Sequence, residues 1–421
     1  MRILKRTAAN RQAPRLLAFA LALGLAACAA PERRVVTAPP PIAVPDAPPP
    51  TALVEAQQNR VALLVPLTGS NAPVGQSIAN AANMALLDVG DKRVNLRVYD
   101  TTPGAAGAAK RALADGARLF LGPLLAGDVR AVQAVAATAG VPVLSFSNDS
   151  SLAGGDVYVL GFQPGQSIAR TIAYAKGRGI DRFAALVPAG VYGQRAQTAF
   201  VRAVDAAGGR STAVVSYTRD PAKMAAAARS VTNYDARIKA GGGTAAIRPD
   251  GSVAAVSGTL APVPFQALLI ADSGSTAAQF LPALAKFGAA PGTIVLLGTE
   301  LWNNEPGLAR AAALRGALFS SVSDERFRRL AERYRAKFGN SPSRLASFGY
   351  DSILLVNNIA GNWPLGAPFP RGQLTTRDGF AGIDGAFRFT PGNIAERSLE
   401  VQQIGNGAIT TVAPAARGFA N

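Results

Sequence analysis

The sequence lacks histidine altogether and contains one cysteine, Cys28, among its 421 residues. Without histidine, general acid–base catalysis by imidazole, Ser-His-Asp triads and histidine-ligated metal sites are excluded. One cysteine cannot form an intramolecular disulfide. Three further enzyme signatures are missing, namely the G-x-S-x-G elbow, the Walker A lysine loop and the S-x-x-K motif. These absences predict a non-enzymatic protein with no catalytic residue, no cofactor and no bound metal.

Acidic residues are also scarce, because 26 Asp and Glu stand against 43 Lys and Arg, which gives a net charge of +17. A basic surface could attract nucleic acid, anionic lipid or an acidic cell-wall polymer. The charge is scattered and most of it is arginine, so it also fits a soluble protein from a GC-rich genome. The export signal described next argues against nucleic acid, and we predict no nucleic-acid partner.

The first 27 residues have the layout of a bacterial export signal. Five basic residues and no acidic one precede an apolar run at 16–27, which is shorter than the roughly 20 residues of a membrane-spanning helix. The run ends in Leu25-Ala26-Ala27-Cys28, which resembles the lipobox of bacterial lipoproteins. We therefore predict a signal peptide at 1–27 and lipidation of Cys28, with an ordinary signal peptide as the alternative. Ala29, where an inner-membrane retention signal would typically place Asp, favours the outer membrane.

A proline-rich segment follows the predicted anchor. Residues 28–57 include seven prolines between positions 37 and 51, and such a run favours extended polyproline II over helix or central strand. At about 3.1 Å per residue the 28 residues 29–56 could reach on the order of 85 Å. We predict a tether that holds a folded body in the periplasm, away from the membrane to which the lipid attaches it.

From residue 61 onward, short apolar runs alternate with segments of helical period. Such runs lack two-residue alternation, so they predict strands buried on both faces, as in parallel sheets. Two successive cycles predict an α/β fold with two doubly wound lobes. The predicted strands are 61–65, 96–99, 118–121 and 141–144 in the first cycle, and 183–187, 213–217, 266–270 and 293–297 in the second.

Later segments complete the pattern. Pro221 opens a predicted helix that runs toward Lys239, and residues 240–265 resemble an inserted loop or small hairpin. Further helices are predicted at 324–338, with Ser323 as the cap, and at 343–359. Residues 385–389 and 399–404 alternate apolar and polar side chains, which predicts an antiparallel pair.

Eight polar or aromatic residues follow the predicted strands and are candidates for a ligand site. In open α/β sheets ligands collect at the carboxyl ends of strands, where hydroxyls and free N–H groups suit an anion such as a carboxylate. Asp272 and Glu300 could meet an ammonium group, and Tyr192 and Trp302 could cover an apolar part. The same residue types also cap helices and form turns, so both interpretations stay open. The candidates are Thr68, Thr101, Ser145, Ser147, Tyr192, Asp272, Glu300 and Trp302.

Several segments together resemble the type I periplasmic binding proteins of the leucine-binding class. They are 61–70, 74–87, Gly122-Pro123, 141–143, 191–194 and 348–351. The resemblance covers about residues 58–410. It implies two lobes crossed by three strands, with a hinge and an interlobe cleft. It places 58–164 and 315–362 in the first lobe, 165–314 and 363–412 in the second, and leaves 413–421 as a tail.

The function implied by the resemblance divides further. Amino-acid binders of this class hold the ligand carboxylate with a serine in the loop after the third strand, whereas this chain has Leu124-Leu125-Ala126. The lipobox, the tether, residues 145–148 and residues 298–302 are similar to lipoproteins called penicillin-binding protein activators. This similarity implies a regulator whose partner is a peptidoglycan synthase. The alternative is the solute-binding receptor of an ABC importer, with an amino acid or a related small anion as ligand.

Overall fold

The computed structural model describes residues 58–419, except Asp91, 242–244, 248–252, 257–259, Asn304 and Pro306. The predicted signal peptide, Cys28 and the tether lie outside the described residues. Within 58–419, apart from those gaps, no helix combines the length and the apolar character needed to cross a membrane.

The first sheet is parallel and is covered on both faces. Its strand order is β2-β1-β3-β4-β5. Successive residues of β1 face different cores, because Leu63 packs in the core that contains α1 and Leu64 packs in the core that contains α2 and α3. This explains the absence of polar alternation in the sequence. The elements are β1 (Asn59–Val65), α1 (Ala72–Val89), β2 (Val94–Asp100), α2 (Ala105–Ala114), β3 (Leu119–Leu121), α3 (Ala126–Ala139), β4 (Val143–Ser145) and β5 (Val157–Val159).

Two later helices, α9 (Glu325–Phe338) and α10 (Ala346–Ala360), share the core of α1. Gly349 permits a close approach, because a Cβ atom at this position would lie 2.2 Å from the Ile78 carbonyl oxygen of α1. Any larger residue would force α1 and α10 apart. Packing of α9 and α10 against α1 therefore holds this part of the chain in the first lobe.

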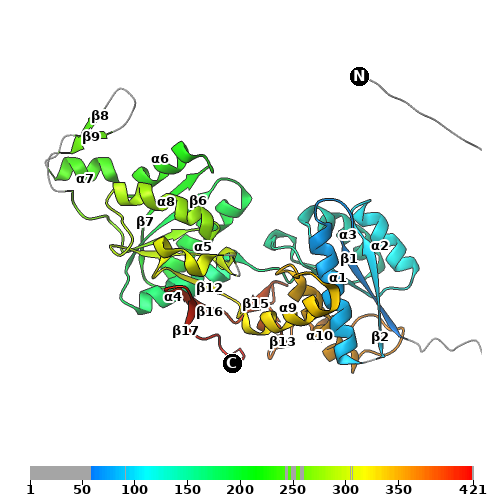
Figure 1. Ribbon diagram of the computed structural model, residues 1–421. Coiled ribbons are helices and arrows are strands. Elements are labelled where there is room, and N and C mark those ends of the chain that lie inside the picture. Colours follow the sequence, from blue (N-terminus) through cyan, green and yellow to red (C-terminus); the bar gives the residue numbers. More distant parts are fainter. Residues whose placement is uncertain are drawn as a thin grey trace, which may run out of the picture. The chain divides into compact units, whose positions relative to one another are not determined.

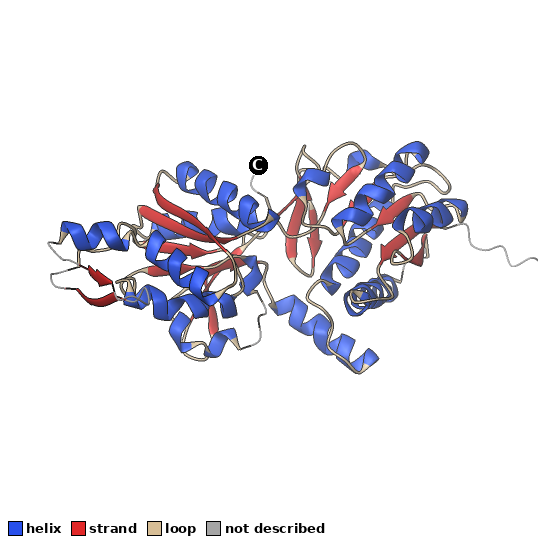
Figure 2. Ribbon diagram, turned by 90° about the horizontal axis from the view of Figure 1, so that it is seen from above, coloured by secondary structure: helices blue, strands red, loops and turns tan. Residues whose placement is uncertain are grey.

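The second sheet has the order β17-β16-β12-β11-β10-β6-β7. The strands β7, β6, β10, β11 and β12 are parallel, and β16 and β17 add an antiparallel edge. Figure 2 shows helices beside the strands of both sheets. The strands are β6 (Arg182–Pro188), β7 (Arg210–Tyr217), β10 (Ala267–Ile270), β11 (Val295–Leu297), β12 (Leu318–Ser321), β16 (Glu400–Ile404) and β17 (Ile409–Ala413).

Helices cover both faces of this sheet as well. Helices α4 and α5 pack in one core, and α6, α7 and α8 pack in the other. These two helical layers over a mainly parallel sheet confirm the predicted α/β fold class for the second lobe. The helices are α4 (Pro164–Gly177), α5 (Val191–Ala206), α6 (Pro221–Val231), α7 (Tyr234–Ala240) and α8 (Gly274–Lys286).

The chain passes between the lobes three times. It leaves the first sheet after β5 and enters α4, returns after β12 to α9, and leaves again after β15 (Ala395–Arg397) for β16 (Figure 1). Three such crossings agree with the arrangement that the resemblance implies.

The predicted antiparallel pair of 385–389 with 399–404 is wrong. Strand β14 (Gly385–Phe389) pairs with β13 (Phe380–Gly382) and β15, whereas β16 pairs with β12 and β17. The three-residue strand β15 is too short to show alternation in the sequence, and it takes the place that the prediction gave to 399–404. Strand β14 therefore belongs to a separate three-stranded sheet.

The lobe boundaries differ from the predicted ones in two places. Trp363, Phe369, Phe380 and Phe387 pack in the core of α1 and α10, so the aromatic side chains hold 363–397 against the first lobe. Strand β12, in contrast, pairs inside the second sheet. Only β16 and β17 of the C-terminal part join the second lobe.

The predicted helix from Pro221 toward Lys239 is broken. Helix α6 ends at Val231, and Asn233 adopts a left-handed conformation with φ 51° before α7 begins. Asparagine tolerates this conformation better than most residues, so the chain turns here. In the predicted insertion, β8 (Ala245–Ile247) and β9 (Val253–Val256) pair antiparallel.

Candidate functional site

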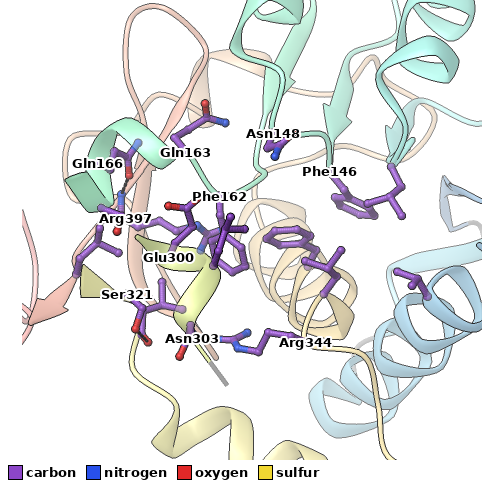
Figure 3. A pocket seen from close by; sticks show the side chains of 18 of the residues that line it. Phe146, Asn148, Phe162, Gln163, Gln166, Glu300, Asn303, Ser321, Arg344 and Arg397 are labelled. Atoms are coloured by element: carbon purple, nitrogen blue, oxygen red, sulfur yellow. Dashed lines mark hydrogen bonds between the residues drawn. The ribbon is translucent and has the colours of Figure 1, made fainter. Parts of the chain in front are cut away.

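A cavity of about 510 Å³ lies where the three crossings converge. Phe162 follows β5, Val322 follows β12, and Leu399 follows β15, and all three residues line the cavity. Figure 3 shows the lining side chains, which come from both lobes. A molecule in this cavity would therefore touch every segment that links the lobes.

Aromatic rings form one wall. The Phe348 ring of α10 lies 5.8 Å from the Phe146 ring and 4.8 Å from the Phe162 ring, measured between centroids. Leu124 and Leu125, which precede α3, also line the cavity. Rings and aliphatic groups at these distances provide a surface for an apolar body.

Two arginines stand at this wall. The Arg344 guanidinium forms ion pairs with Asp384 (2.8 Å) and Asp324 (3.3 Å). Burial raises the pKa of Asp324, and Arg344 opposes that rise. The charge of Arg344 is therefore balanced by carboxylates of the protein itself.

Arg397 is only 7% exposed and is held differently. Its guanidinium lies 5.1 Å from the Phe162 and Phe387 ring centroids and 5.6 Å from that of Phe348. Nη2 donates to the Leu160 carbonyl oxygen at 3.0 Å, whereas Nε and Nη1 have no hydrogen-bond partner among the described residues. Burial lowers the pKa of Arg397, and the nearby charges of Asp384 and Asp351 oppose this. Ring faces thus surround a buried cation, an arrangement that is favourable by cation–π attraction.

The polar part of the wall is the turn after β11. Glu300 begins a 3-10 turn (Glu300–Trp302), and the Thr299 hydroxyl accepts from the Leu301 N–H at 3.4 Å. The Tyr192 hydroxyl of α5 donates to Glu300 Oε1 at 3.1 Å. Glu300 Oε2 and Asn303 Oδ1 are buried, and neither has a hydrogen-bond partner in the described part of the chain. Two acceptor oxygens of one turn are therefore left unsatisfied at the cavity wall.

Burial raises the pKa of Glu300 to about 7, although its own backbone N–H and the Tyr192 hydroxyl favour the ionised form. No cation forms an ion pair with Glu300 within the described ranges. The carboxyl group can therefore gain or lose a proton near neutral pH.

The four hydroxyl candidates of the first lobe lie outside the cavity lining. The Thr68 hydroxyl donates to Asp100 at 2.8 Å, and Thr101 is buried beside Asp128. The Ser145 and Ser147 hydroxyls accept from backbone N–H groups two residues further along, each at 3.1 Å. The structure therefore gives the hydroxyls of Thr68, Ser145 and Ser147 roles in loops and turns, whereas the Thr101 hydroxyl is buried without a hydrogen-bond partner among the described residues.

Of the second-lobe candidates, only Glu300 lines the cavity. Asp272 is 1% exposed and accepts hydrogen bonds from Tyr217 and Arg219. Trp302 is fully buried in the core, and its indole N–H donates to the Asp272 carbonyl oxygen at 2.8 Å. Tyr192 reaches Glu300 but is absent from the lining. The structure thus brings Tyr192 and Glu300 together and places Trp302 in the core of the second lobe.

Sequence reasoning missed Asn303, Arg397 and the three rings. Arg397 ends a strand too short to be predicted, and Phe162 follows another three-residue strand. Asn303 lies one residue beyond the 298–302 segment that the sequence analysis singled out, so that segment was the one available signal.

Comparison with known proteins gives a family match over most of the folded part. The family model described as periplasmic binding protein matches residues 58–407. Among curated proteins, an uncharacterized protein of Rickettsia prowazekii is 27% identical over 142 residues, which are 33% of this chain and 38% of that protein. The match thus spans less than half of that relative.

Solved structures with the same fold include amino-acid and other ligand-binding proteins, and LpoA. The leucine-binding protein LivK of Thermotoga maritima has 20% identity and a TM-score of 0.56, covering 84% of this chain and 98% of its own. A periplasmic ligand-binding protein of a branched-chain amino acid ABC transporter from Burkholderia xenovorans has 16% identity and a TM-score of 0.63, covering 85% and 95%. Full-length LpoA of Haemophilus influenzae has 19% identity and a TM-score of 0.61, covering 85% of this chain and 59% of its own.

Proposed function

Because this chain belongs to the periplasmic binding protein family, we propose that it is a non-enzymatic binding module that regulates a peptidoglycan synthase from a lipid anchor in the outer membrane. The lipobox-like end of the signal and the proline-rich segment 28–57 support the anchor and its reach. The similarity to LpoA supports the role, since it extends the resemblance to penicillin-binding protein activators over 85% of the chain.

The observation that carries this proposal is the lining of the first lobe. Thr101, Ser145 and Ser147 are buried and are not among the lining residues. The described residues that the first lobe contributes to the cavity carry amides, rings, aliphatic groups and two guanidinium groups but no hydroxyl. The two guanidinium groups, those of Arg344 and Arg397, already face carboxylates of the protein. A receptor for amino acids needs donors for the ligand carboxylate, and the hydroxyls predicted for that purpose are missing from this wall.

The test uses residues 28–421 purified with and without lipid. Each form is added to a purified bifunctional peptidoglycan synthase, and glycan polymerisation and cross-linking are measured. We expect both forms to bind the synthase and to raise one of the two rates. The variant Cys28→Ser should retain this effect in solution but lose membrane attachment in cells. If neither binding nor a change in rate occurs, the proposal fails.

The cavity itself favours a second function, that of a receptor for a small solute. A volume of about 510 Å³ and two unsatisfied acceptors on one turn are features of a ligand site. Thermal-shift screening with small solutes tests this function, because a ligand at 100 times its Kd adds about 2.7 kcal/mol to the free energy of unfolding. If no solute raises the Tm, the receptor function fails while the regulatory one is untouched.

A further inference from the structure

We propose that the cavity takes a primary amine with an aromatic or branched aliphatic body and no carboxylate group. This inference rests on the second function proposed above, that the cavity receives a small molecule. It departs from the sequence-based alternative, which was an amino acid or a small anion.

The first step concerns the polar end of the ligand. Glu300 Oε2 and Asn303 Oδ1 lie on the same turn, line the same cavity and lack partners among the described residues (Figure 3). Asn303 hydrogen-bonds Asp324 through its side chain, which fixes the amide. Both free atoms are acceptors, so the group that would satisfy them must be a donor. An ammonium group has three donors and the charge that complements the Glu300 carboxylate.

The second step concerns the ligand body. The Phe146, Phe162 and Phe348 rings and the side chains of Leu124 and Leu125 line the cavity. A phenyl or branched alkyl group would bury apolar surface there, which stabilises a complex by roughly 25 cal/mol per Å². A small polar amine would leave this wall uncovered.

The third step concerns charge. Arg344 is paired with Asp324 and Asp384, and the charge of Arg397 is opposed by Asp351 and Asp384. Glu300, in contrast, has no cationic partner within the described residues. An ammonium group would supply that partner and would favour the ionised form of Glu300, so binding should release a proton near neutral pH.

The lining offers a carboxylate ligand two guanidinium groups, those of Arg344 and Arg397, besides uncharged amides. Arg344 is already paired with Asp324 and Asp384, which leaves Arg397 as the stronger candidate. The Nε and Nη1 atoms of Arg397 are unpartnered, but both are buried among the rings of Phe162, Phe348 and Phe387. The charge of Arg397 is also opposed by Asp351 and Asp384, whereas the Glu300 carboxylate has no cation beside it within the described residues.

The experiment compares ligands that share a body and differ in the head group. Phenethylamine, phenylalanine and 3-phenylpropionate form one set, and isoamylamine, leucine and 4-methylpentanoate form another. Residues 28–421 without lipid are titrated calorimetrically at pH 6 and pH 8, in buffers of different ionisation enthalpy. We expect both amines to bind, with a lower Kd at pH 8 and with proton release, and the amino acids and carboxylates to bind at least about tenfold more weakly.

Variants locate the binding. Glu300→Gln keeps the shape of the side chain but removes its charge, and we expect it to raise the Kd of the amines at least about tenfold. Glu325→Gln removes an exposed carboxylate at the start of α9, outside this cavity, and should leave the Kd unchanged. Circular dichroism and Tm show that each variant is folded.

The outcomes separate the inference from the proposed functions. Tighter binding of the carboxylates or amino acids than of the amines overturns the inference but keeps the receptor function. Amine binding that Glu300→Gln does not weaken also overturns it. If no compound of either set binds, the inference fails, and the synthase assay above still decides the regulatory function independently.

Discussion

Two acids at neighbouring strand ends of the second sheet have opposite environments. Asp272 follows β10 and accepts hydrogen bonds from the Tyr217 hydroxyl, the Arg219 guanidinium and the Ser273 N–H. Glu300 follows β11, and its Oε1 accepts a hydrogen bond from the Tyr192 hydroxyl. Its Oε2 has no hydrogen-bond partner in the described structure. The sequence analysis predicted that both acids could meet an ammonium group. The difference teaches that a carboxylate is available to a ligand only where the fold leaves it incompletely paired.

The pKa values follow the same division. Burial raises the pKa of Asp272, but Arg219 and Tyr217 outweigh burial and hold it below 3.8. Burial raises the pKa of Glu300 from 4.5 to about 7, because its few hydrogen bonds do not compensate. Asp272 is therefore a structural anion, and Glu300 is a group with an adjustable charge.

The largest expected effect on stability comes from Trp302, which lies on the turn of Glu300 and donates a hydrogen bond to the backbone of Asp272. Trp302→Ala removes a fully buried ring and the hydrogen bond to the Asp272 carbonyl oxygen. We expect a loss of about 3–5 kcal/mol in the free energy of unfolding, measured by urea denaturation. Trp302→Phe should lose clearly less. A loss below 1 kcal/mol for the alanine variant would show that the ring is not a core residue and would restore it as a cover for a ligand.

Next in size is the removal of the paired acid. Asp272→Asn leaves the Tyr217 hydroxyl and the Arg219 guanidinium without an anionic acceptor, and we expect a loss of about 2–4 kcal/mol at pH 7. Glu300→Gln is the matched variant and should be neutral or stabilising at the same pH. Equal losses in the two variants would mean that the two carboxylates are held alike and would break the comparison.

The pH dependence of stability should differ in sign between the two sites. The pKa of Glu300 is raised in the folded protein, so the protonated Glu300 side chain contributes fully to the free energy of unfolding below pH 4.5. This contribution is lost as pH rises through about 7. Glu300→Gln should therefore match the wild type at pH 4 and exceed it by about 2–3 kcal/mol at pH 8. The pKa of Asp272 is lowered, so its contribution is present above pH 3.8 and is lost as pH falls below that value. Chemical denaturation from pH 3 to 8 measures both, and parallel curves for Glu300→Gln and wild type would contradict the assignment.

The smallest effect is expected from the hydroxyl that reaches Glu300. Tyr192→Phe removes donation to Glu300 Oε1 and the contact with the Thr299 hydroxyl. We expect a loss of about 1 kcal/mol and a further rise in the pKa of Glu300, because the ionised form loses a donor. A ¹³C NMR titration of the glutamate carboxyl groups reads this pKa directly. An unchanged or lower pKa would show that Tyr192 does not support the ionised form.

Patterns in the sequence sufficed for the elements and the fold class. The uninterrupted apolar runs around Leu63 and Leu268 are buried on both faces of parallel sheets, as expected from residues that cannot alternate. The predictions failed where an element has only three residues, as in β15. They also failed where the pairing of a strand depends on residues far away in the sequence, as for β14 and β16. Periodicity identifies a strand but does not name its neighbour.

The site was decided by tertiary structure. Sequence placed Glu300 correctly at a strand end, but it gave equal standing to Asp272, Ser145 and Trp302, which the fold uses for ion pairing, a turn and the core. Arg397, Asn303 and Phe162 come from separate segments and meet only where the three crossings converge. Local residue type thus determined which elements form, because a strand that is buried on both faces appears in the sequence as a short uninterrupted run of apolar residues. Which polar atoms stay without partners depends on contacts between distant residues, and only the folded chain settles that.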